Sequence, residues 1–260
     1  MLTIEERNKL AIYVKKNNLH KVNLGAKRVN PQKGIYLCYV KRLIDIAVSL
    51  CALIFTFPIN VMIGIGIFFD VGNPIFFRQE RPGKDEKMFT MIKFRSMMNG
   101  KDERGNLLPI RQRVTKFGSF IRRTSLDELL NFWSILKGDM SVIGPRPLAT
   151  IYLDRYSERH KARHKVRPGL ECPNLKFGGY GHGWQEQFEN DVWYVENVSF
   201  FVDCKMFLCL FKMVFDKDMR KNHAVTGAGD FIGYDDNGIA FGANNIPTKY
   251  LELIYQMGEK

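Results

Sequence analysis

The longest apolar stretch of the chain runs from Leu43 to Phe69, and Asp45 is its one charged residue. A straight helix of that length would measure roughly 40 Å, which exceeds the ~30 Å hydrocarbon core of a bilayer. Pro58 lies near the middle, where a proline removes a backbone hydrogen-bond donor and bends or breaks a helix. The pattern predicts a membrane segment, either a tilted span or a re-entrant hairpin of two short helices.

Basic residues flank this segment on both sides, at Lys33, Lys41, Arg42, Arg78, Arg81, Lys84 and Lys87. Lysine and arginine are enriched in cytoplasmic loops, so both ends of the segment are expected in the cytoplasm. This favours the re-entrant hairpin, with Asp45 paired to Lys41 or Arg42 one turn away at the membrane interface. A long core helix of a soluble protein is the alternative that the length and apolarity disfavour.

The remaining pattern predicts an α+β fold that is mostly helical and anchored in a membrane. Strand-like runs at 75–79 and 88–94 flank a Pro82-Gly83 turn and predict a β-hairpin. Apolar periodicity predicts helices at 2–19, 110–123, 148–165, 200–215 and 248–257. The basic stretches 2–19 and 110–123 are typical of amphipathic interfacial helices, although a helix that packs on a partner or on the core fits the same spacing.

Charge indicates the chemistry of the partners. Lys and Arg number 39 against 27 Asp and Glu, a net charge of +12, which favours anionic partners such as lipid headgroups or phosphorylated metabolites. Nucleic acid is not expected, because no recognition motif is present. The five cysteines form no CxxC pair and their number is odd, which favours a reduced, cytosol-facing protein.

Candidate chemistry concentrates in one block, RRTSLDELLNFWSILKGDMSVIGPR, at residues 122–146. Asp127 and Glu128 form an adjacent carboxylate pair at the start of a predicted amphipathic helix. Ser125 and Glu128 fit a capping box, and Gly138 is a natural C-terminal stop for this helix. Taken alone, an Asp-Glu pair behind a serine N-cap is an ordinary helix start.

The arginines around this carboxylate pair change its interpretation. Planar guanidinium groups, which bind diphosphate oxygens in pairs, come from Arg122, Arg123, Arg146 and Arg167. A helix N-terminus also favours phosphate, through its free N–H groups and its positive partial charge. Two carboxylates among arginines therefore predict a nucleophile or metal ligand that faces a phosphorylated substrate.

Several blocks, in this order, resemble the monotopic phosphoglycosyl transferases, also called the bacterial sugar transferase family. They are KRLID, QERPGKDEKMF, IKFRSM, RRTSLDELLNFWSILKGDMSVIGPRP, RHKVRPG and DVWYVENVSFFVD, and they extend from about residue 41 to about residue 215. The resemblance implies transfer of a sugar phosphate from a nucleotide sugar, with UDP as the expected nucleotide, to polyprenyl (undecaprenyl) phosphate. It further implies Mg²⁺ as cofactor, a lipid bilayer as partner, and an active site on the cytoplasmic face of the bacterial inner membrane. A homo-oligomer is left open.

The resemblance also implies roles for individual residues. Asp127 would be the nucleophile that attacks the β-phosphate, forming an aspartyl-phosphosugar intermediate and releasing UMP. Glu128 would be its essential partner, and both carboxylates would hold the metal. The remaining catalytic candidates are Lys93 and Asp191. The candidates for phosphate or substrate binding are Arg146, Arg167, Arg122 and Arg81, and the expected break in the membrane hairpin is Pro58.

The resemblance divides the chain into an N-terminal extension (1–40), a membrane hairpin (41–70), a cytoplasmic catalytic domain (71–220) and a C-terminal tail (221–260). The extension and the tail match no part of the family. After Gly169 the family commonly continues ITGWAQVNGR, whereas this chain reads LECPNLKFGGYGHG, so the sugar is not predicted. A catalytically silent, membrane-anchored scaffold that binds anionic lipid or a glycan-assembly partner is the alternative function.

Overall fold

The computed structural model describes residues 2–100, 102–103, 105, 108–177, 183–215 and 228–258. The longer helices are α1 (Ile4–Leu24), α2 (Lys41–Val71), α4 (Lys116–Arg123), α5 (Asn131–Lys137), α7 (Trp184–Asn197), α8 (Phe200–Phe215) and α10 (Thr248–Gly258). Short helical turns are η1 (Tyr36–Val40), η2 (Lys84–Glu86), α3 (Ile110–Arg113), η3 (Leu126–Glu128), η4 (Thr150–Arg155), α6 (Glu158–Lys161) and η5 (Ala162–Lys165). The described strands are β1 (Phe76–Pro82), β2 (Met88–Phe94), β3 (Ser141–Ile143), β4 (Gly169–Glu171), β5 (Phe231–Tyr234) and β6 (Ala240–Gly242).

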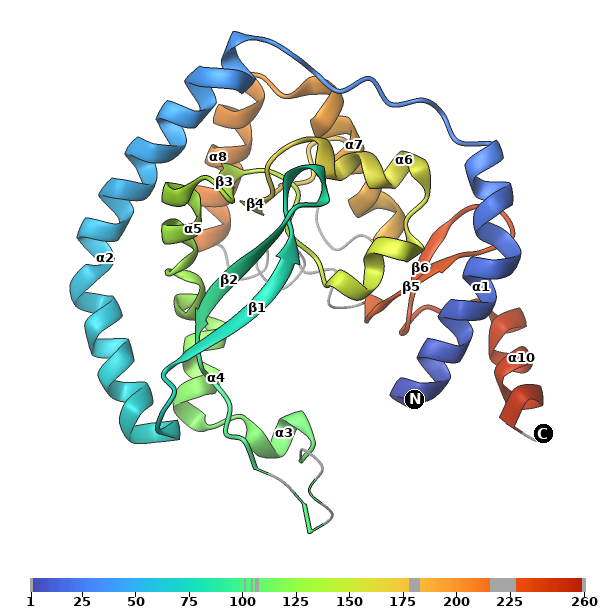
Figure 1. Ribbon diagram of the computed structural model, residues 1–260, viewed down its shortest axis with the longest axis horizontal. Helices are drawn as coiled ribbons and strands as arrows, with labels where there is room; N and C mark the ends of the chain where they lie inside the picture. The colour runs from blue at the N-terminus through green and yellow to red at the C-terminus, as the bar shows by residue number, and fades with distance from the viewer. Residues whose placement is uncertain are drawn as a thin grey trace.

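The fold mixes helices with small sheets, as predicted, and the sheets formed by the described strands each have two strands. In Figure 1, α2 curves along one edge of the molecule, the β1–β2 hairpin crosses the middle, and both termini lie at the opposite edge. The predicted hairpin is confirmed, with β1 and β2 antiparallel and Phe77 opposite Lys93.

The apolar segment forms one long helix. Residues Tyr36–Val71 are continuously helical, and they are long and apolar enough to cross a membrane. The helix continues through Pro58, so the expected interruption there is not found. The ribbon of α2 instead bends near its middle (Figure 1), as expected where a proline removes one helical hydrogen bond.

The predicted pairing of Asp45 with Lys41 or Arg42 was wrong. The Asp45 carboxylate is buried and accepts hydrogen bonds from the Ser141 hydroxyl (2.9 Å) and the Val142 N–H (3.0 Å). Lys41 pairs with Asp203 of α8, at 2.7 Å. These contacts join the start of α2 to β3 and α8, so the charge of Asp45 is satisfied inside the protein.

Two predicted helices are divided. The stretch 110–123 splits into α3 and α4 because Thr115 adopts an extended conformation and caps α4, accepting a hydrogen bond from the Gly118 N–H (2.8 Å). The stretch 148–165 becomes η4, α6 and η5, with Ser157 as the N-cap of α6. In both cases an internal Ser or Thr supplies a local cap that ends one helical segment and begins the next.

The two ends of the chain form one packed unit, here called the terminal module (residues 2–24 and 228–258). Buried residues of α1 lie in one cluster with residues of β5, β6 and α10, namely Leu10, Ala11, Val14, Ile232, Phe241, Tyr250 and Ile254. The apolar face of α1 therefore packs on a partner within the same chain rather than on a membrane. The predicted C-terminal helix is confirmed as α10.

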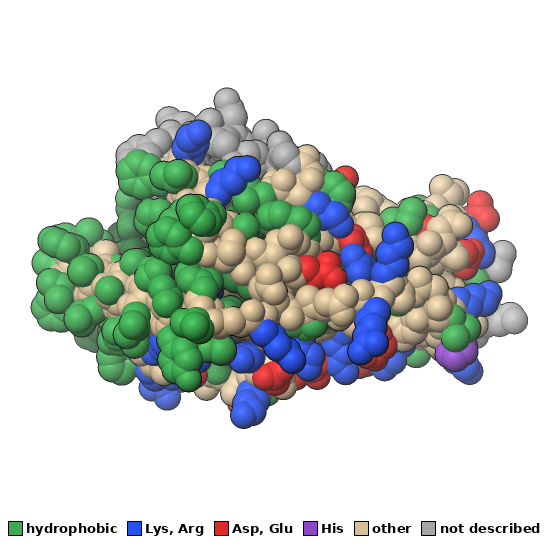
Figure 2. Space-filling model, turned by 90° about the horizontal axis from the view of Figure 1, so that it is seen from above, with side chains coloured by type: hydrophobic (Ala, Val, Ile, Leu, Met, Phe, Trp, Pro, Cys, Tyr) green, Lys and Arg blue, Asp and Glu red, His purple; other side chains and the backbone are tan. Residues whose placement is uncertain are grey.

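A broad apolar surface covers the α2 edge of the molecule. Figure 2 shows hydrophobic side chains gathered at that end and charged side chains over the rest of the face. Its exposed members on α2 and α8 include Leu50, Ile54, Phe55, Phe57, Phe201, Leu208 and Phe211. Contiguous apolar surface of this kind marks contact with another apolar phase, which for a helix of this length and composition fits a bilayer.

Candidate active site

The predicted carboxylates lie on a short turn rather than on a helix N-terminus. Ser125 has φ 56° and makes no side-chain cap, so the predicted capping box is wrong. Residues Leu126–Glu128 form the 3₁₀ turn η3, and α5 begins only at Asn131. The predicted stop at Gly138 is confirmed, because this residue ends α5 with φ 100°, a backbone conformation that suits glycine.

Packing explains the short turn. Leu126, Leu129 and Leu130 pack against a cluster of buried residues from α2, β2 and α4, namely Ile63, Ile67, Phe94 and Ile121. Burial of these leucines outweighs the local preference of a serine N-cap. The turn therefore presents Asp127 and Glu128 away from its apolar side.

Glu128 is held by two basic residues that the sequence singled out. The Lys93 ammonium lies 2.7 Å from Oε1, and a terminal nitrogen of Arg146 lies 2.5 Å from the same oxygen. Burial alone would raise the pKa of Glu128, but the charges of Arg146 and Lys93 outweigh it and lower the pKa to about 2. Glu128 is thus a fixed negative charge at neutral pH, and its ion pairs within the described part of the chain all involve the same oxygen, Oε1.

Asp127, the neighbour of Glu128 in the chain, has its pKa shifted in the opposite direction. Among the residues that the structure describes, its carboxylate forms no ion pair within 4.0 Å. Burial and the negative charge of Glu128 raise the pKa of Asp127, and Lys93 only partly opposes this. A carboxylate whose charge is less stabilised is a better nucleophile, so the two neighbours suit different tasks.

Arg146 is aimed at Glu128 by a rigid segment. Pro145 and Pro147 restrict the backbone on either side. Its guanidinium also donates to the Leu170 carbonyl (3.1 Å), and its own carbonyl accepts a hydrogen bond from Arg163 (2.8 Å). The segment is brought there by the parallel β3–β4 pair, where a Cβ on Gly169 would lie 2.1 Å from the Gly144 nitrogen.

Asp191 is not brought to the two carboxylates. It is completely buried and accepts one hydrogen bond from Arg163 Nε (2.9 Å) and one from Gln187 (3.0 Å). A terminal nitrogen of Arg163 completes an ion pair with the same carboxylate at 2.8 Å. Its contact with the cluster runs through Arg163 to the Arg146 carbonyl. Arg163 was not among the predicted site residues, although it is the first letter of the block RHKVRPG and could have been found there.

The other predicted phosphate ligands lie in different environments. Arg167 donates to the Gly138 carbonyl (3.0 Å), and Arg42 donates to the Ile135 and Leu136 carbonyls (2.6 and 2.7 Å), so both arginines cap the C-terminus of α5. Arg122 is exposed. Arg81 is half-buried and donates a hydrogen bond to Gln79 (2.7 Å), and burial together with the positive charge of Arg146 lowers its pKa.

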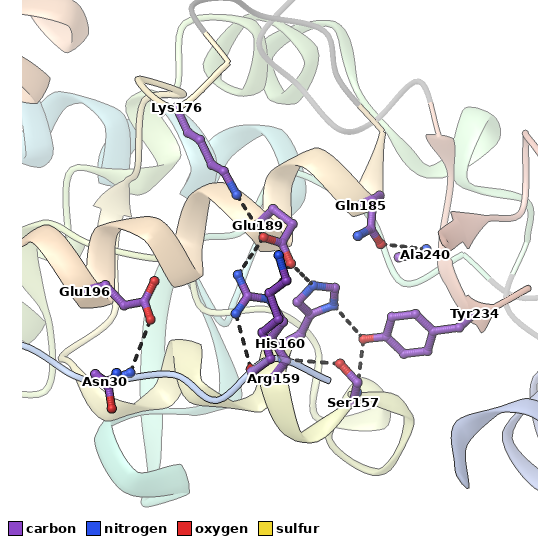
Figure 3. Close-up of polar contacts among 11 residues, drawn as sticks. Asn30, Ser157, Arg159, His160, Lys176, Gln185, Glu189, Glu196, Tyr234 and Ala240 are labelled. Carbon is purple, nitrogen blue, oxygen red and sulfur yellow. Dashed lines mark hydrogen bonds and ion pairs between the residues drawn. The ribbon is translucent and has the colours of Figure 1, made fainter. Parts of the chain in front are cut away.

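A second polar network joins the catalytic region to the terminal module (Figure 3). Glu189 of α7 accepts hydrogen bonds from Arg159 (2.6 and 2.8 Å) and Lys176 (2.8 Å). The buried His160 ring lies between Glu189 (3.0 Å) and the Tyr234 hydroxyl of β5 (2.9 Å). This network holds both ends of the segment between Lys176 and α7, where the sequence departs from the family pattern. Within that segment, residues 178–182 lie outside the described part of the chain.

Comparison with known proteins identifies the class. The family described as bacterial sugar transferase matches residues 36–217. "Uncharacterized sugar transferase EpsL" of Bacillus subtilis is 41% identical over 198 residues, which are 74% of this chain and 98% of that protein. The chain therefore belongs to the bacterial sugar transferase family, as its sequence blocks predicted, and is a transferase by class.

Relatives with a stated activity cover the same region. The UDP-glucose:undecaprenyl-phosphate glucose-1-phosphate transferase of Klebsiella pneumoniae is 37% identical over 199 residues, 72% of this chain and 43% of that protein. The undecaprenyl-phosphate galactose phosphotransferase of Salmonella typhimurium is 32% identical over 197 residues, 69% of this chain and 41% of that protein. The chain spans less than half the length of these two relatives, and the terminal module lies outside the family match.

Proposed function

We propose that the protein transfers a sugar phosphate from a UDP-sugar to undecaprenyl phosphate, in the first membrane step of a glycan assembly. The observation that carries this proposal is the charged cluster at η3, where Asp127 with a raised pKa lies beside a Glu128 held by Lys93 and Arg146. The names of the Klebsiella and Salmonella relatives, which state undecaprenyl phosphate as acceptor, support the substrate class.

The reaction would proceed in two displacements at one phosphorus atom. A carboxylate oxygen of Asp127 attacks the β-phosphorus of the donor, the bond from that phosphorus to the bridging oxygen breaks, and UMP leaves. An oxygen of undecaprenyl phosphate then attacks the same phosphorus, the bond to Asp127 breaks, and the free carboxylate returns. Splitting one difficult transfer into two steps is the general advantage of a covalent nucleophile.

The neighbouring residues would supply charge and position. Arg146 and Lys93 face the site with positive charge, which stabilises the negative oxygens of the transferring group. Glu128 keeps both cations in place through Oε1. Arg163 and Asp191 act as positioning residues, because they hold the backbone of Arg146 rather than the substrate.

The carboxylates fit a Mg²⁺ ion that shares its coordination with substrate. Among the described residues there is no cluster of three or more His, Cys, Asp or Glu side chains that could hold a metal alone. Mg²⁺ binds through one or two carboxylates plus substrate phosphates, and Asp127 with the second oxygen of Glu128 offers that number. When bound, the ion would neutralise charge on the diphosphate.

We further propose that α2 enters and leaves the bilayer on the cytoplasmic side of the inner membrane. The basic residues on both flanks support this topology, and so does the bend of α2 near its middle (Figure 1). It would hold the carboxylate turn at the depth of lipid headgroups, where the acceptor's phosphate lies. Cysteine labelling on both sides of residues 43–69 tests it, and an external Asp70 would exclude it.

The proposed reaction is tested with protein in nanodiscs, Mg²⁺, undecaprenyl phosphate and a panel of UDP-sugars. The expected result is UMP and a lipid-linked sugar phosphate with at least one donor, together with a phosphosugar adduct on Asp127 by intact mass when the acceptor is left out. Absence of product with every donor, while the protein still binds anionic vesicles, would support a silent scaffold instead.

A further inference from the structure

A third carboxylate, that of Glu171, lies beside the guanidinium group of Arg146. Glu171 Oε2 is 3.5 Å from Nη1 of Arg146, whereas Glu128 contacts the other terminal nitrogen, Nη2. Glu171 is the last residue of β4, and its side chain is 20% exposed. It stands second after Gly169, where the common family continuation ITGWAQVNGR has a threonine, so this negative charge is particular to the chain.

The position of Glu171 is fixed by the residues around it. Because β4 pairs with β3, the Glu171 carbonyl accepts a hydrogen bond from the Gly144 N–H (3.2 Å). Its side-chain Oε1 accepts a hydrogen bond from the Cys172 N–H (3.1 Å). The buried Asn190 of α7 donates to the Cys172 carbonyl (3.2 Å) and so fixes the chain that follows. Both the backbone and one carboxylate oxygen of Glu171 are therefore held in place.

Arg146 does not depend on Glu171 for its position. A separation of 3.5 Å is long for a hydrogen bond, whereas Glu128 lies 2.5 Å from Nη2 and the Leu170 carbonyl lies 3.1 Å from Nη1. Glu128 and Leu170 thus hold the guanidinium group by shorter contacts. Glu171 instead places a negative charge next to the group that would bind the donor's phosphate.

The donor in the proposed reaction has two different groups attached to its β-phosphorus. One is UMP, whose phosphate is anionic, and the other is the sugar, whose hydroxyl or amino groups donate hydrogen bonds. A carboxylate accepts hydrogen bonds from such groups and repels a second anion. With a β-phosphate oxygen bound to Arg146, the carboxylate of Glu171 therefore favours the orientation in which the sugar lies against it and UMP lies away from it.

We propose that Glu171 is a specificity-determining residue, which accepts a hydrogen bond from a hydroxyl or amino group of the donor sugar and excludes sugars that carry a carboxylate. This inference rests on the proposed function and adds the class of sugar, which the sequence does not predict. The donor is then a UDP-linked neutral or amino sugar. A repulsive charge of this kind rejects a competing substrate without any new contact to the correct one.

The first test compares a neutral donor with the UDP-uronic acid that differs from it only at C6. Wild-type kcat/KM is expected to be about 100-fold lower for the uronic donor, because two carboxylates then lie close together. Glu171→Gln keeps the size of the side chain and removes its charge, so it should reduce this ratio about 10-fold or more and leave the KM for undecaprenyl phosphate within about 2-fold. Glu80→Gln, at an exposed position of β1, is the matched control and should keep the wild-type ratio.

The outcomes separate specificity from support of Arg146. If Glu171→Gln loses turnover by the same factor with every donor, or raises the KM for undecaprenyl phosphate in parallel, Glu171 is a support for Arg146 and the proposal is overturned. A wild-type protein that uses the uronic donor as well as the neutral one would also overturn it. A wild-type protein that forms no product with any donor contradicts the proposed function itself.

A second measurement uses binding without turnover. Asp127→Asn protein in nanodiscs with Mg²⁺ is titrated by calorimetry with UMP and with the neutral UDP-sugar, before and after the further change Glu171→Ala. The added change should weaken binding of the UDP-sugar about 10-fold and leave that of UMP within about 2-fold, because UMP lacks the sugar that donates the hydrogen bond. Unchanged affinity for the UDP-sugar, or tighter binding of UMP, would place the sugar elsewhere and overturn the proposal.

Discussion

Two carboxylate–arginine pairs, Glu128–Arg146 and Asp191–Arg163, use the same chemical groups in opposite surroundings. The Arg146 and Glu128 side chains are 40% and 21% exposed, whereas those of Arg163 and Asp191 are 1% and 0% exposed. A charge that water and substrate reach can change partners during a reaction, but a sealed charge has to keep its partner. Burial, rather than residue type, thus separates the pair that we propose contacts substrate from the pair that holds the Arg146 backbone.

The largest expected effect is a loss of turnover, and it concerns Asp127 beside the partly exposed Glu128–Arg146 pair. Asp127→Asn removes the proposed nucleophile and should lower turnover by about 10⁴-fold or more. The variant should unfold at or slightly above the wild-type temperature, because Asp127 has no ion pair among the described residues and the fold disfavours its charge. UMP release and thermal unfolding in nanodiscs measure both quantities, with Glu80→Gln on the exposed edge of β1 as the matched carboxylate-to-amide control. Wild-type turnover in Asp127→Asn would remove Asp127 as the nucleophile.

The next effect is a loss of stability, and it concerns the buried Asp191–Arg163 pair. Arg163→Met leaves the buried Asp191 carboxylate without its cation and should lower the free energy of unfolding by about 3–5 kcal/mol. Adding Asp191→Asn to the same chain removes that unpaired charge and should recover part of the loss. Denaturant unfolding of the two variants gives the comparison. An Arg163→Met protein as stable as wild type but inactive would move this pair from positioning to catalysis.

Glu128→Gln is expected to separate activity from stability. The amide no longer holds Lys93 and Arg146 by charge, so turnover should fall by about 10²-fold. The loss in unfolding free energy should be only about 1 kcal/mol, because all three side chains remain partly solvated. Steady-state kinetics and unfolding on the same preparation measure the two effects, and a loss of stability as large as that of Arg163→Met would contradict the contrast between the pairs.

Arg167→Met distinguishes a helix cap from a phosphate ligand. Loss of the hydrogen bond to the Gly138 carbonyl should lower the unfolding free energy by about 0.5–1.5 kcal/mol and leave the KM for the donor nearly unchanged. Kinetics with varied UDP-sugar provide the second readout. A donor KM that rises 10-fold with no change in stability would instead support the predicted role in phosphate binding.

The smallest effect concerns acid pH. The pKa of Glu128 is lowered in the folded state to about 2, so its contribution to stability is complete above its unfolded pKa, near 4.5, and is lost as the pH falls toward 2. The difference in unfolding free energy between wild type and Glu128→Gln should therefore decrease as the pH falls across this range. A difference that stays constant from pH 7 to pH 2.5 would contradict this pKa.

Local patterns predicted the parts of the fold that depend on neighbouring residues. Strand alternation around Pro82-Gly83 was sufficient for the β-hairpin, and the apolar run located α2, although the expected break at Pro58 is absent. The Ser125 capping box failed because burial of Leu126 and its neighbours decides the backbone there. Local rules describe what a segment prefers, and packing decides when that preference is overruled.

The candidate site shows the same division. Asp127, Glu128, Lys93 and Arg146 could be predicted because recognisable sequence blocks carry them. The fully buried position of Asp191 and its link through Arg163 to the Arg146 carbonyl could not, because they depend on residues 17 and 28 positions apart meeting in space. The terminal module was missed for the same reason, since α1 meets β5 across most of the chain.

The arginine at the start of α2 connects this helix directly to α5, which follows the carboxylate turn. Arg42 of α2 donates to the last carbonyls of α5, the helix that begins just after the carboxylate turn. A truncated protein without residues 36–71 would lose the hydrogen bonds from Arg42 to the C-terminus of α5. It would also expose Leu126, Leu129 and Leu130, which pack on Ile63 and Ile67 of α2. Solubilised fragments are therefore poor stand-ins for the enzyme, and inhibitor screens should be run on the full chain in lipid.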